Sequence, residues 1–171
     1  GVSYQNTMNA ASYRVESAEA DWKSYELGSG YGIPLHGGYH AIPPLDRLYN
    51  LRSRISMYLE AMGVAVKYHH HEVGGPGQCE IETSLLPLLK AADATLLIKY
   101  ITRMTAFDAG MTATFMPKPL YGEAGSGMHF HQHIWKNDVN LCYDPAGYGC
   151  MSKLARQYMA GLLHHGGAVM A

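Results

Sequence analysis

Histidine recurs at every second position in Gly125–Trp135, GSGMHFHQHIW, and this alternation constrains the fold more than any other feature of the chain. Successive side chains of a β-strand point to opposite faces, so the imidazoles of His129, His131 and His133 would form one row. The intervening, mostly apolar residues suit a buried face. Imidazole binds metals and donates to phosphate. The sequence therefore favours a strand that carries a functional site, with a half-exposed strand of surface histidines as the alternative.

Composition excludes several classes of protein. The chain has 171 residues, 47% of them hydrophobic, and 13 Lys and Arg residues stand against 14 Asp and Glu residues. Without runs of like charge, we expect neither a nucleic-acid surface nor a polybasic membrane patch. No apolar run approaches the roughly 18 to 20 residues that span a bilayer, and no signal peptide is recognised. Three cysteines without zinc-site spacing suit free thiols in a reducing, cytoplasmic compartment.

Three helices are predicted from apolar residues spaced three and four positions apart. The first follows Asp46, which we expect to be its N-cap, and ends before Gly63. The second covers Leu86–Ala109, with Gly110 as its C-terminal cap. The third begins after Ser152, a good N-cap residue.

Strands are predicted in the intervals. Val64–Val73 and Cys79–Ser84 flank a glycine-rich turn and should form a hairpin. Ser3–Arg14 and Thr112–Met116 are shorter or weaker strand candidates. Hairpins interleaved with helices, without a regular βαβ rhythm, indicate an α+β fold with a mostly antiparallel sheet.

A second polar cluster lies on the predicted hairpin, where three consecutive histidines precede Glu72, and Glu80 begins the return strand. The hairpin would bring these two carboxylates close together. Close carboxylates repel unless a cation lies between them, and carboxylate oxygens favour Mg²⁺ or Mn²⁺. Two exposed acids are the alternative. Together with the histidine strand, the pattern favours a mixed Glu/His site for divalent cations, which commonly serve phosphate chemistry.

Three segments resemble the catalytic domain of type I glutamine synthetase: KYHHHEVGGPGQCEIE at 67–82, TATFMPKPLYGEAGSGMHFHQ at 112–132 and GGYHAIPP at 37–44. Their order and spacing also fit that family. The resemblance implies an α+β fold with a curved, mostly antiparallel sheet and flanking helices. Residues 1–171 would then be part of one catalytic domain, incomplete at both ends.

The same resemblance implies an activity. Members of the family ligate glutamate and ammonium to glutamine at the expense of ATP, through a γ-glutamyl phosphate intermediate. They use two divalent cations per site, Mg²⁺ or Mn²⁺, and type I members are homododecamers of two hexameric rings. A cytoplasmic ligase of this kind, without nucleic-acid or membrane partners, is the expectation for this chain.

Site residues are assigned by resemblance, position by position. Glu72 and Glu80 are expected to bind the cation nearer glutamate, and His129 the cation nearer the nucleotide. Tyr39 matches a tyrosine near the ammonium pocket. The remaining expected contacts are to the nucleotide, from Thr83, Ser84, Leu85, His131, Gln132 and His133, and to glutamate, from Ala124 and Gly125.

Three residues depart from the family pattern. Lys67 stands where most members carry Glu, Ala124 where many carry Asn, and His133 where Ser is common. The resemblance places further metal-binding and phosphate-stabilising groups outside residues 1–171, and a neighbouring subunit would close the site. We therefore expect no certain catalytic residue in this segment and no activity from the segment alone.

Three alternatives stay open. A γ-glutamyl-polyamine synthetase would share the metal and ATP chemistry but use a different amine. A hydrolase or oxygenase would use the HxHxH pattern to bind Zn²⁺ or Fe²⁺ and would be indifferent to ATP. A non-catalytic protein that kept the fold would bind no nucleotide.

Overall fold

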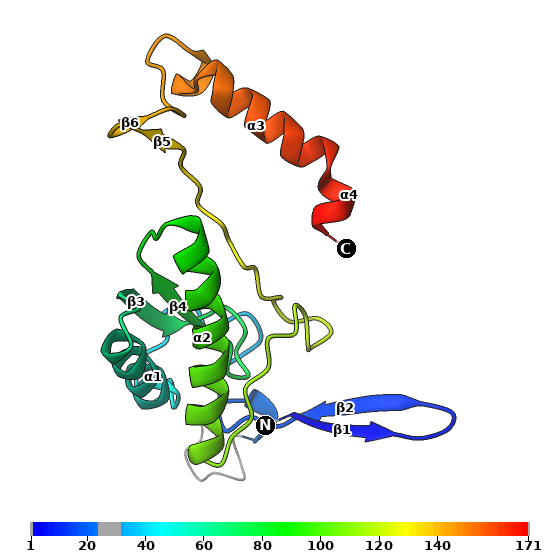
Figure 1. The fold of residues 1–171 in the computed structure, drawn as a ribbon. Coiled ribbons are helices and arrows are strands. Elements are labelled where there is room, and N and C mark those ends of the chain that lie inside the picture. Colours follow the sequence, from blue (N-terminus) through cyan, green and yellow to red (C-terminus); the bar gives the residue numbers. More distant parts are fainter. Residues whose placement is uncertain (1, 24–31, 171) are drawn as a thin grey trace. The chain divides into compact units, whose positions relative to one another are not determined.

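The structure is a computed structural model that describes residues 2–23 and 32–170. It divides into two compact units, Gly1–Met128 and His129–Ala171. Within the described ranges the named strands form three two-stranded antiparallel sheets, which confirms the α+β class (Figure 1). The strands are β1 (Val2–Asn6), β2 (Ala11–Val15), β3 (Val66–His71), β4 (Cys79–Thr83), β5 (Trp135–Lys136) and β6 (Val139–Asn140). The helices are α1 (Tyr49–Ala61), α2 (Leu88–Asp108), α3 (Lys153–His164) and α4 (Gly166–Val169), with short 3₁₀ turns at Asp21–Lys23 and Tyr148–Cys150.

Helices α1 and α2 build the core of the first unit. Residues four apart share one helix face, and Ile55 and Leu59 of α1 are accordingly buried against Ala94 and Ile101 of α2. Helix α1 is followed by Gly63 at a φ of +85°, a backbone conformation that favours glycine, so this predicted stop is confirmed. In the part of the chain that the structure describes, no helix is both long and apolar enough to cross a membrane.

The prediction that Asp46 caps α1 is wrong. The helix begins at Tyr49, and Leu48 occupies the N-cap position without a side-chain cap bond. The Asp46 carboxylate instead accepts a hydrogen bond from Arg52, with Nη1 and Oδ1 3.0 Å apart. The guanidinium, one turn into the helix, forms a charge-assisted pair with this carboxylate. The same carboxylate accepts a hydrogen bond from Leu48 N at 3.1 Å, so it lies just before the helix and is held from both sides.

The predicted hairpin of β3 and β4 is confirmed, with His70 directly opposite Glu80 in the antiparallel ladder. One face of the hairpin meets α1, where Nε of Arg52 lies 3.4 Å from Nδ1 of His69. Because side chains alternate between the faces of a strand, His70 and Glu72 lie on the opposite face. The hairpin register therefore separates a packing face from a polar face.

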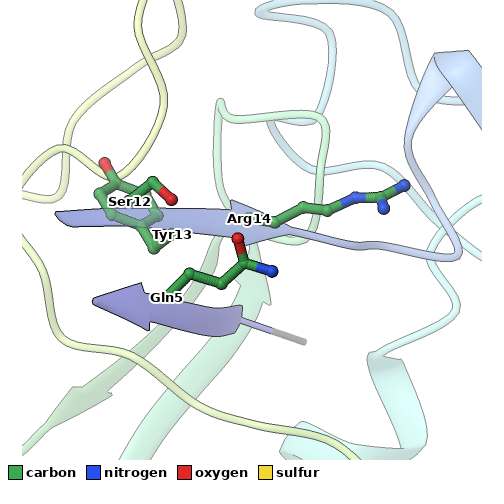
Figure 2. Close-up of a pocket in the computed structure, with 4 residues that line it drawn as sticks. All are labelled: Gln5, Ser12, Tyr13 and Arg14. Atoms are coloured by element: carbon green, nitrogen blue, oxygen red, sulfur yellow. The ribbon is translucent and has the colours of Figure 1, made fainter. Parts of the chain in front are cut away.

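The N-terminal segment holds two strands where the sequence predicted one. A turn, in which Thr7 N donates to Ala10 O at 2.8 Å, splits the run into β1 and β2, which pair antiparallel. A hollow of about 330 Å³ lies on this hairpin (Figure 2). It is lined by Gln5, Ser12, Tyr13 and Arg14, and none of the predicted site residues is among them.

The strands predicted at 129–135 and Thr112–Met116 are wrong. Among the described residues, the first run joins a ladder only at its end, where Trp135 starts β5, and Thr112–Met116 joins none. The side chains of Met128 and Phe130 are exposed rather than buried. A strand needs a second row of backbone groups to pair with, and the described residues supply none beside these runs.

Ser152 caps α3 as predicted, since its Oγ accepts a hydrogen bond from Ala155 N at 3.1 Å. Its hydroxyl also donates to Leu141 O at 2.6 Å. Changing Ser152→Ala should therefore lower the free energy of unfolding by about 1 kcal/mol. Urea unfolding would measure the loss, with Lys153→Ala, an exposed neighbour, as the control. An unchanged midpoint for Ser152→Ala would show that the cap contributes nothing.

Candidate functional site

Three potential metal ligands lie together on the polar face of the β3–β4 hairpin. They are His70, Glu72 and Glu80, and one ligand atom from each lies within 4.8 Å of the others. Nε2 of His70 and Oε2 of Glu80 are 3.8 Å apart. Directly opposite residues of an antiparallel pair share a face, so the ladder places His70 beside Glu80. The predicted proximity of the two carboxylates is confirmed.

The electrostatics of this cluster suit a cation. Partial burial and a hydrogen bond with the Glu72 carboxyl raise the pKa of Glu80, while the nearby His70 ring opposes that shift. Two carboxyls that compete for one proton are relieved when a cation lies between them. Two carboxylates and an imidazole also form a donor set that Mn²⁺ and similar divalent ions accept. The residues present therefore fit a divalent cation.

A buried pair beneath this cluster holds the end of β3. Nε2 of His71 lies 3.1 Å from Oε2 of Glu19, and Nδ1 lies 2.6 Å from the carbonyl oxygen of Glu72. The carbonyl and the carboxylate both accept hydrogen bonds, an arrangement that favours a doubly protonated ring, the imidazolium. Burial lowers the pKa of His71, but the bonds to Glu19 and Glu72 outweigh it, and the net pKa is raised.

The loop that carries Tyr39 lies against the hairpin. The Tyr39 ring meets the His70 ring edge-on, with centroids 5.4 Å apart. Gly38 is packed so closely that a Cβ there would clash with the Glu72 carbonyl and the His71 ring. Glycine is thus required for this approach, which brings Tyr39 beside the cluster.

The predicted substrate loop is tied to the hairpin turn. Nε2 of Gln78 donates to the carbonyl oxygen of Gly125 at 2.9 Å and lies 3.2 Å from Ser126 Oγ. The buried carboxylate of Glu123 accepts a bond from Ala124 N at 3.1 Å. The backbone of Ala124 and Gly125 is therefore held at the turn between the two metal-ligand candidates.

The nucleotide-binding candidates of the first unit lie where β4 ends. Thr83 is the last residue of β4, and Ser84 N donates to Ala65 O at 3.0 Å. Leu85 is exposed. Lys67, which stands where most members of the resembled family carry Glu, forms an ion pair with Glu82 on β4. The charge of its ammonium group is therefore already balanced within the hairpin.

The other predicted residues lie in the second unit, in an extended run without ladder partners among the described residues. The Tyr158 hydroxyl donates to the side-chain oxygen of Gln132. The ring of His133 stacks parallel to that of Trp135, with centroids 6.4 Å apart. The imidazoles of His129, His131 and His133 are all exposed.

The sequence analysis did not single out His70, which the structure places beside Glu72 and Glu80. The alternation of a strand separates His70 from His69 and His71, and a hairpin closed by the glycine turn pairs it with Glu80. Both signals were present in the sequence.

Comparisons with known proteins identify the family to which this chain is similar. The family model described as glutamine synthetase, catalytic domain, matches residues 2–171. The glutamine synthetase of Streptomyces filamentosus is 42% identical over 172 residues, which cover 99% of this chain and 37% of that protein. The 3-hydroxylaminophenol mutase of Cupriavidus pinatubonensis is also 42% identical, over 100% of this chain and 37% of its own length.

A solved structure extends the match to the fold. The cryo-EM structure of Plasmodium falciparum glutamine synthetase superposes with a TM-score of 0.83 at 30% identity, covering 97% of this chain and 34% of that one. The chain thus spans about 37% of the length of the curated relatives that it matches. Because the family model covers nearly every residue, the chain belongs to the glutamine synthetase catalytic-domain family.

Proposed function

We propose that the natural full-length protein containing this chain ligates glutamate and ammonium to glutamine at the expense of ATP, through γ-glutamyl phosphate. The observation that carries the proposal is the pair of carboxylates, Glu72 and Glu80, on one hairpin face of a chain from this family. The relative and the solved structure that are named glutamine synthetase support it. A cytoplasmic homododecamer of two hexameric rings, with residues 1–171 as part of one catalytic domain, is included in the proposal.

The two carboxylates would hold one divalent cation, Mg²⁺ or Mn²⁺. A cation bound there would neutralise the charge that develops on phosphate and carboxylate oxygens during phosphoryl transfer. Glu80 lies in the hairpin ladder, and Glu72 follows directly after it, where Glu72 N donates to Gln78 O at 2.9 Å, so these ligands need little rearrangement on binding. Tyr39, edge-on to this cluster, would form part of the wall of the ammonium pocket.

The other predicted residues take the remaining roles in this proposal. The backbone of Ala124 and Gly125, held by Gln78, would meet the amino end of glutamate. His129 would bind the second cation. Nucleotide contacts would come from Thr83, Ser84, Leu85, His131, Gln132 and His133.

One comparison favours a second candidate function. The relative named 3-hydroxylaminophenol mutase is as similar to this chain as the relative from Streptomyces filamentosus. A mutase rearranges its substrate and needs neither ATP nor an amine. Sequence identity over this segment therefore does not distinguish the ligase from the mutase. The two activities must be distinguished by testing which substrates the protein converts.

The proposal is tested by phosphate release from ATP by the natural full-length protein with Mg²⁺ and glutamate, with and without ammonium. Release that requires ammonium supports the ligase. Release that requires a polyamine instead identifies the γ-glutamyl-polyamine synthetase alternative. No release from ATP, together with conversion of 3-hydroxylaminophenol, would identify the mutase. Conversion of neither substrate set would overturn both candidates.

The carboxylate pair is tested by Glu80→Gln, which keeps the shape of the side chain and removes its charge. Glutamate-dependent turnover should fall by about 100-fold, because a cation loses one of its anionic ligands. Nucleotide binding should stay largely intact. Glu60→Gln, an exposed position on α1, is the matched control. Wild-type turnover in Glu80→Gln would remove Glu80 from the metal role.

A further inference from the structure

Glu123 carries a buried carboxylate to which the proposed function gives no task. The residue is 3% exposed and directly precedes Ala124 and Gly125 in the predicted substrate loop. An ionised carboxylate is costly to bury unless hydrogen-bond donors surround it. Among the described residues its Oε1 has such donors, whereas its Oε2 is buried without a hydrogen-bond partner. A polar group that is kept in the interior at this cost is a candidate for a functional role.

Donors from two segments that are far apart in the sequence converge on Oε1 of Glu123. The backbone N of His36, 87 positions away, donates to it at 3.0 Å. The backbone N of Ala124 donates to it at 3.1 Å. Nδ1 of His36 lies 3.2 Å from the same oxygen. The carboxylate therefore cross-links two loops and does more than close a local turn.

The His36 side of this cross-link is itself held firmly. His36 has a φ of +58°, a conformation that is uncommon for residues with a side chain and persists only where surrounding contacts stabilise it. Two residues later, Gly38 N donates to Val73 O at 3.0 Å, just after the end of β3. The backbone of His36 is thus a fixed point to which Glu123 is attached.

The substrate loop is held on both sides of Ala124. Its own N–H is bonded to Glu123, and the next carbonyl group, that of Gly125, accepts a hydrogen bond from Nε2 of Gln78 at 2.9 Å. Ala124 has no polar side-chain atom, so the backbone alone offers hydrogen bonds at this position. A short stretch of backbone between two fixed points has little conformational freedom left to lose.

We propose that Glu123 is a positioning residue that holds the backbone of Ala124 and Gly125 in the geometry that receives the amino end of glutamate. It does so as a hydrogen-bond acceptor through Oε1, and its negative charge is not required. The inference rests on the glutamate site of the proposed function. Glu123 acts through the backbone of Ala124 and not by touching the substrate. A loop that is ordered before the substrate arrives loses less freedom on binding, so removal of this anchor should weaken glutamate binding.

The test is steady-state phosphate release from ATP by the natural full-length protein, with glutamate varied at saturating ammonium. Glu123→Met keeps the length of the side chain, removes both oxygens and should raise the KM for glutamate about 10-fold. The maximal rate should fall by less than about 3-fold and the KM for ATP should change by less than about 2-fold, because only glutamate binding depends on this loop. Glu123→Gln keeps a carbonyl oxygen for the same donors and should leave the KM for glutamate within about 2-fold of wild type.

Two further measurements separate positioning from folding. Tyr121→Ala removes an exposed side chain of the same loop and should leave the KM for glutamate unchanged. In the wild type, amide hydrogen exchange should show protection at His36 N and Ala124 N, and glutamate should raise both protections together, since both donate to one oxygen. Rapid exchange at both amides would overturn the inference, even where Glu123→Met fails to fold.

The outcomes distinguish this inference from the proposed function. Glutamate-dependent release by the wild type, with an unchanged KM in Glu123→Met, would overturn the positioning role and leave the ligase standing. An equal rise of the KM in Glu123→Met and Glu123→Gln would overturn the acceptor role of Oε1. No glutamate-dependent release by the wild type would overturn the proposed function and, with it, this inference. A rise in Glu123→Met alone supports both.

Discussion

Arg52→Met is expected to lower the free energy of unfolding by about 3–5 kcal/mol, because it leaves the Asp46 carboxylate buried without its partner. Arg52 and Asp46 are 1% and 3% exposed. Both guanidinium Nη atoms donate to the carboxylate, Nη1 to Oδ1 at 3.0 Å and Nη2 to Oδ2 at 2.5 Å. Such a bidentate pair joins the start of α1 to the loop before it. The substitution should therefore destabilise the whole first unit and not only fray the end of α1.

The loss should depend on pH. Burial would raise the pKa of Asp46, but the hydrogen bonds and charge of Arg52 outweigh it and hold the pKa below the ordinary value of 3.8. A carboxyl whose pKa is lower in the folded state stabilises the fold above its unfolded pKa. That contribution disappears as the pH falls through the folded pKa. The difference between wild type and Arg52→Met should thus be largest at neutral pH and shrink below about pH 4.

Urea unfolding at several pH values, at one protein concentration, would measure this difference. Arg54→Met is the matched control, since Arg54 lies on the same helix and is exposed. Asp46→Asn combined with Arg52→Met should recover part of the loss, because the uncompensated charge is then absent. A loss in Arg52→Met no larger than in Arg54→Met would contradict the prediction.

The spacing of apolar residues along the sequence predicted the elements whose contacts lie within a short stretch of chain. The spacing of Ile55 and Leu59 and the stop at Gly63 located α1, because burial of one helix face requires that spacing. The glycine turn between β3 and β4 likewise fixed a hairpin whose strands are adjacent in sequence. In both cases the determining contacts lie within a short stretch of chain.

Elements that depend on distant partners were not predictable in this way. The histidine run from His129 to His133 has the alternation of a strand, but alternation does not supply a neighbouring strand. Asp46 has the chemistry of an N-cap, yet it lies just before the helix and pairs with Arg52. Periodicity gives the faces of an element, while the partner of each face is a tertiary property.

In the candidate site, too, local motifs were predictable from the sequence and contacts between distant segments were not. The family motifs located Glu72, Glu80 and the loop at Gly125, and the structure places all three around one hairpin. Nothing local linked Glu19 to His71, which lies 52 positions later in the chain. Buried polar pairs between distant segments have no periodic signature, so their consequences must be derived from the structure.

Glu19→Ala is expected to lower the free energy of unfolding by about 3–5 kcal/mol, since it would leave the His71 imidazolium buried without an anion. Glu19 and His71 are 2% and 0% exposed. The same carboxylate accepts hydrogen bonds from two backbone donors, Arg47 N at 2.6 Å and Leu48 N at 3.3 Å. Removing it therefore leaves Arg47 N and the ring of His71 without this acceptor, each at a cost of about 1–3 kcal/mol, while Leu48 N keeps Asp46 Oδ1 as an acceptor at 3.1 Å.

Glu19→Gln should retain most of the stability that Glu19→Ala loses. The amide oxygen can accept from the backbone donors of Arg47 and Leu48, as the carboxylate does. The amide NH₂ can donate to Nε2 of His71 once that ring becomes neutral and keeps its proton on Nδ1, where it still donates to the Glu72 carbonyl. A change of tautomer thus substitutes for the ion pair.

The free energy of unfolding of both variants would be measured beside that of Glu60→Gln, an exposed control on α1. The comparison decides whether the charge of Glu19 or its hydrogen bonds stabilise the protein at this position. Equal losses in Glu19→Gln and Glu19→Ala would show that the imidazolium is essential and contradict the tautomer argument.

Amide hydrogen exchange measures the same change locally. Because His71 Nδ1 holds the Glu72 carbonyl, Glu19→Ala should release the end of β3 first, with protection at Glu72 N lost before that in α2. Uniform loss of protection would instead mean that Glu19 stabilises the whole first unit and does not specifically position the Glu72 carboxylate.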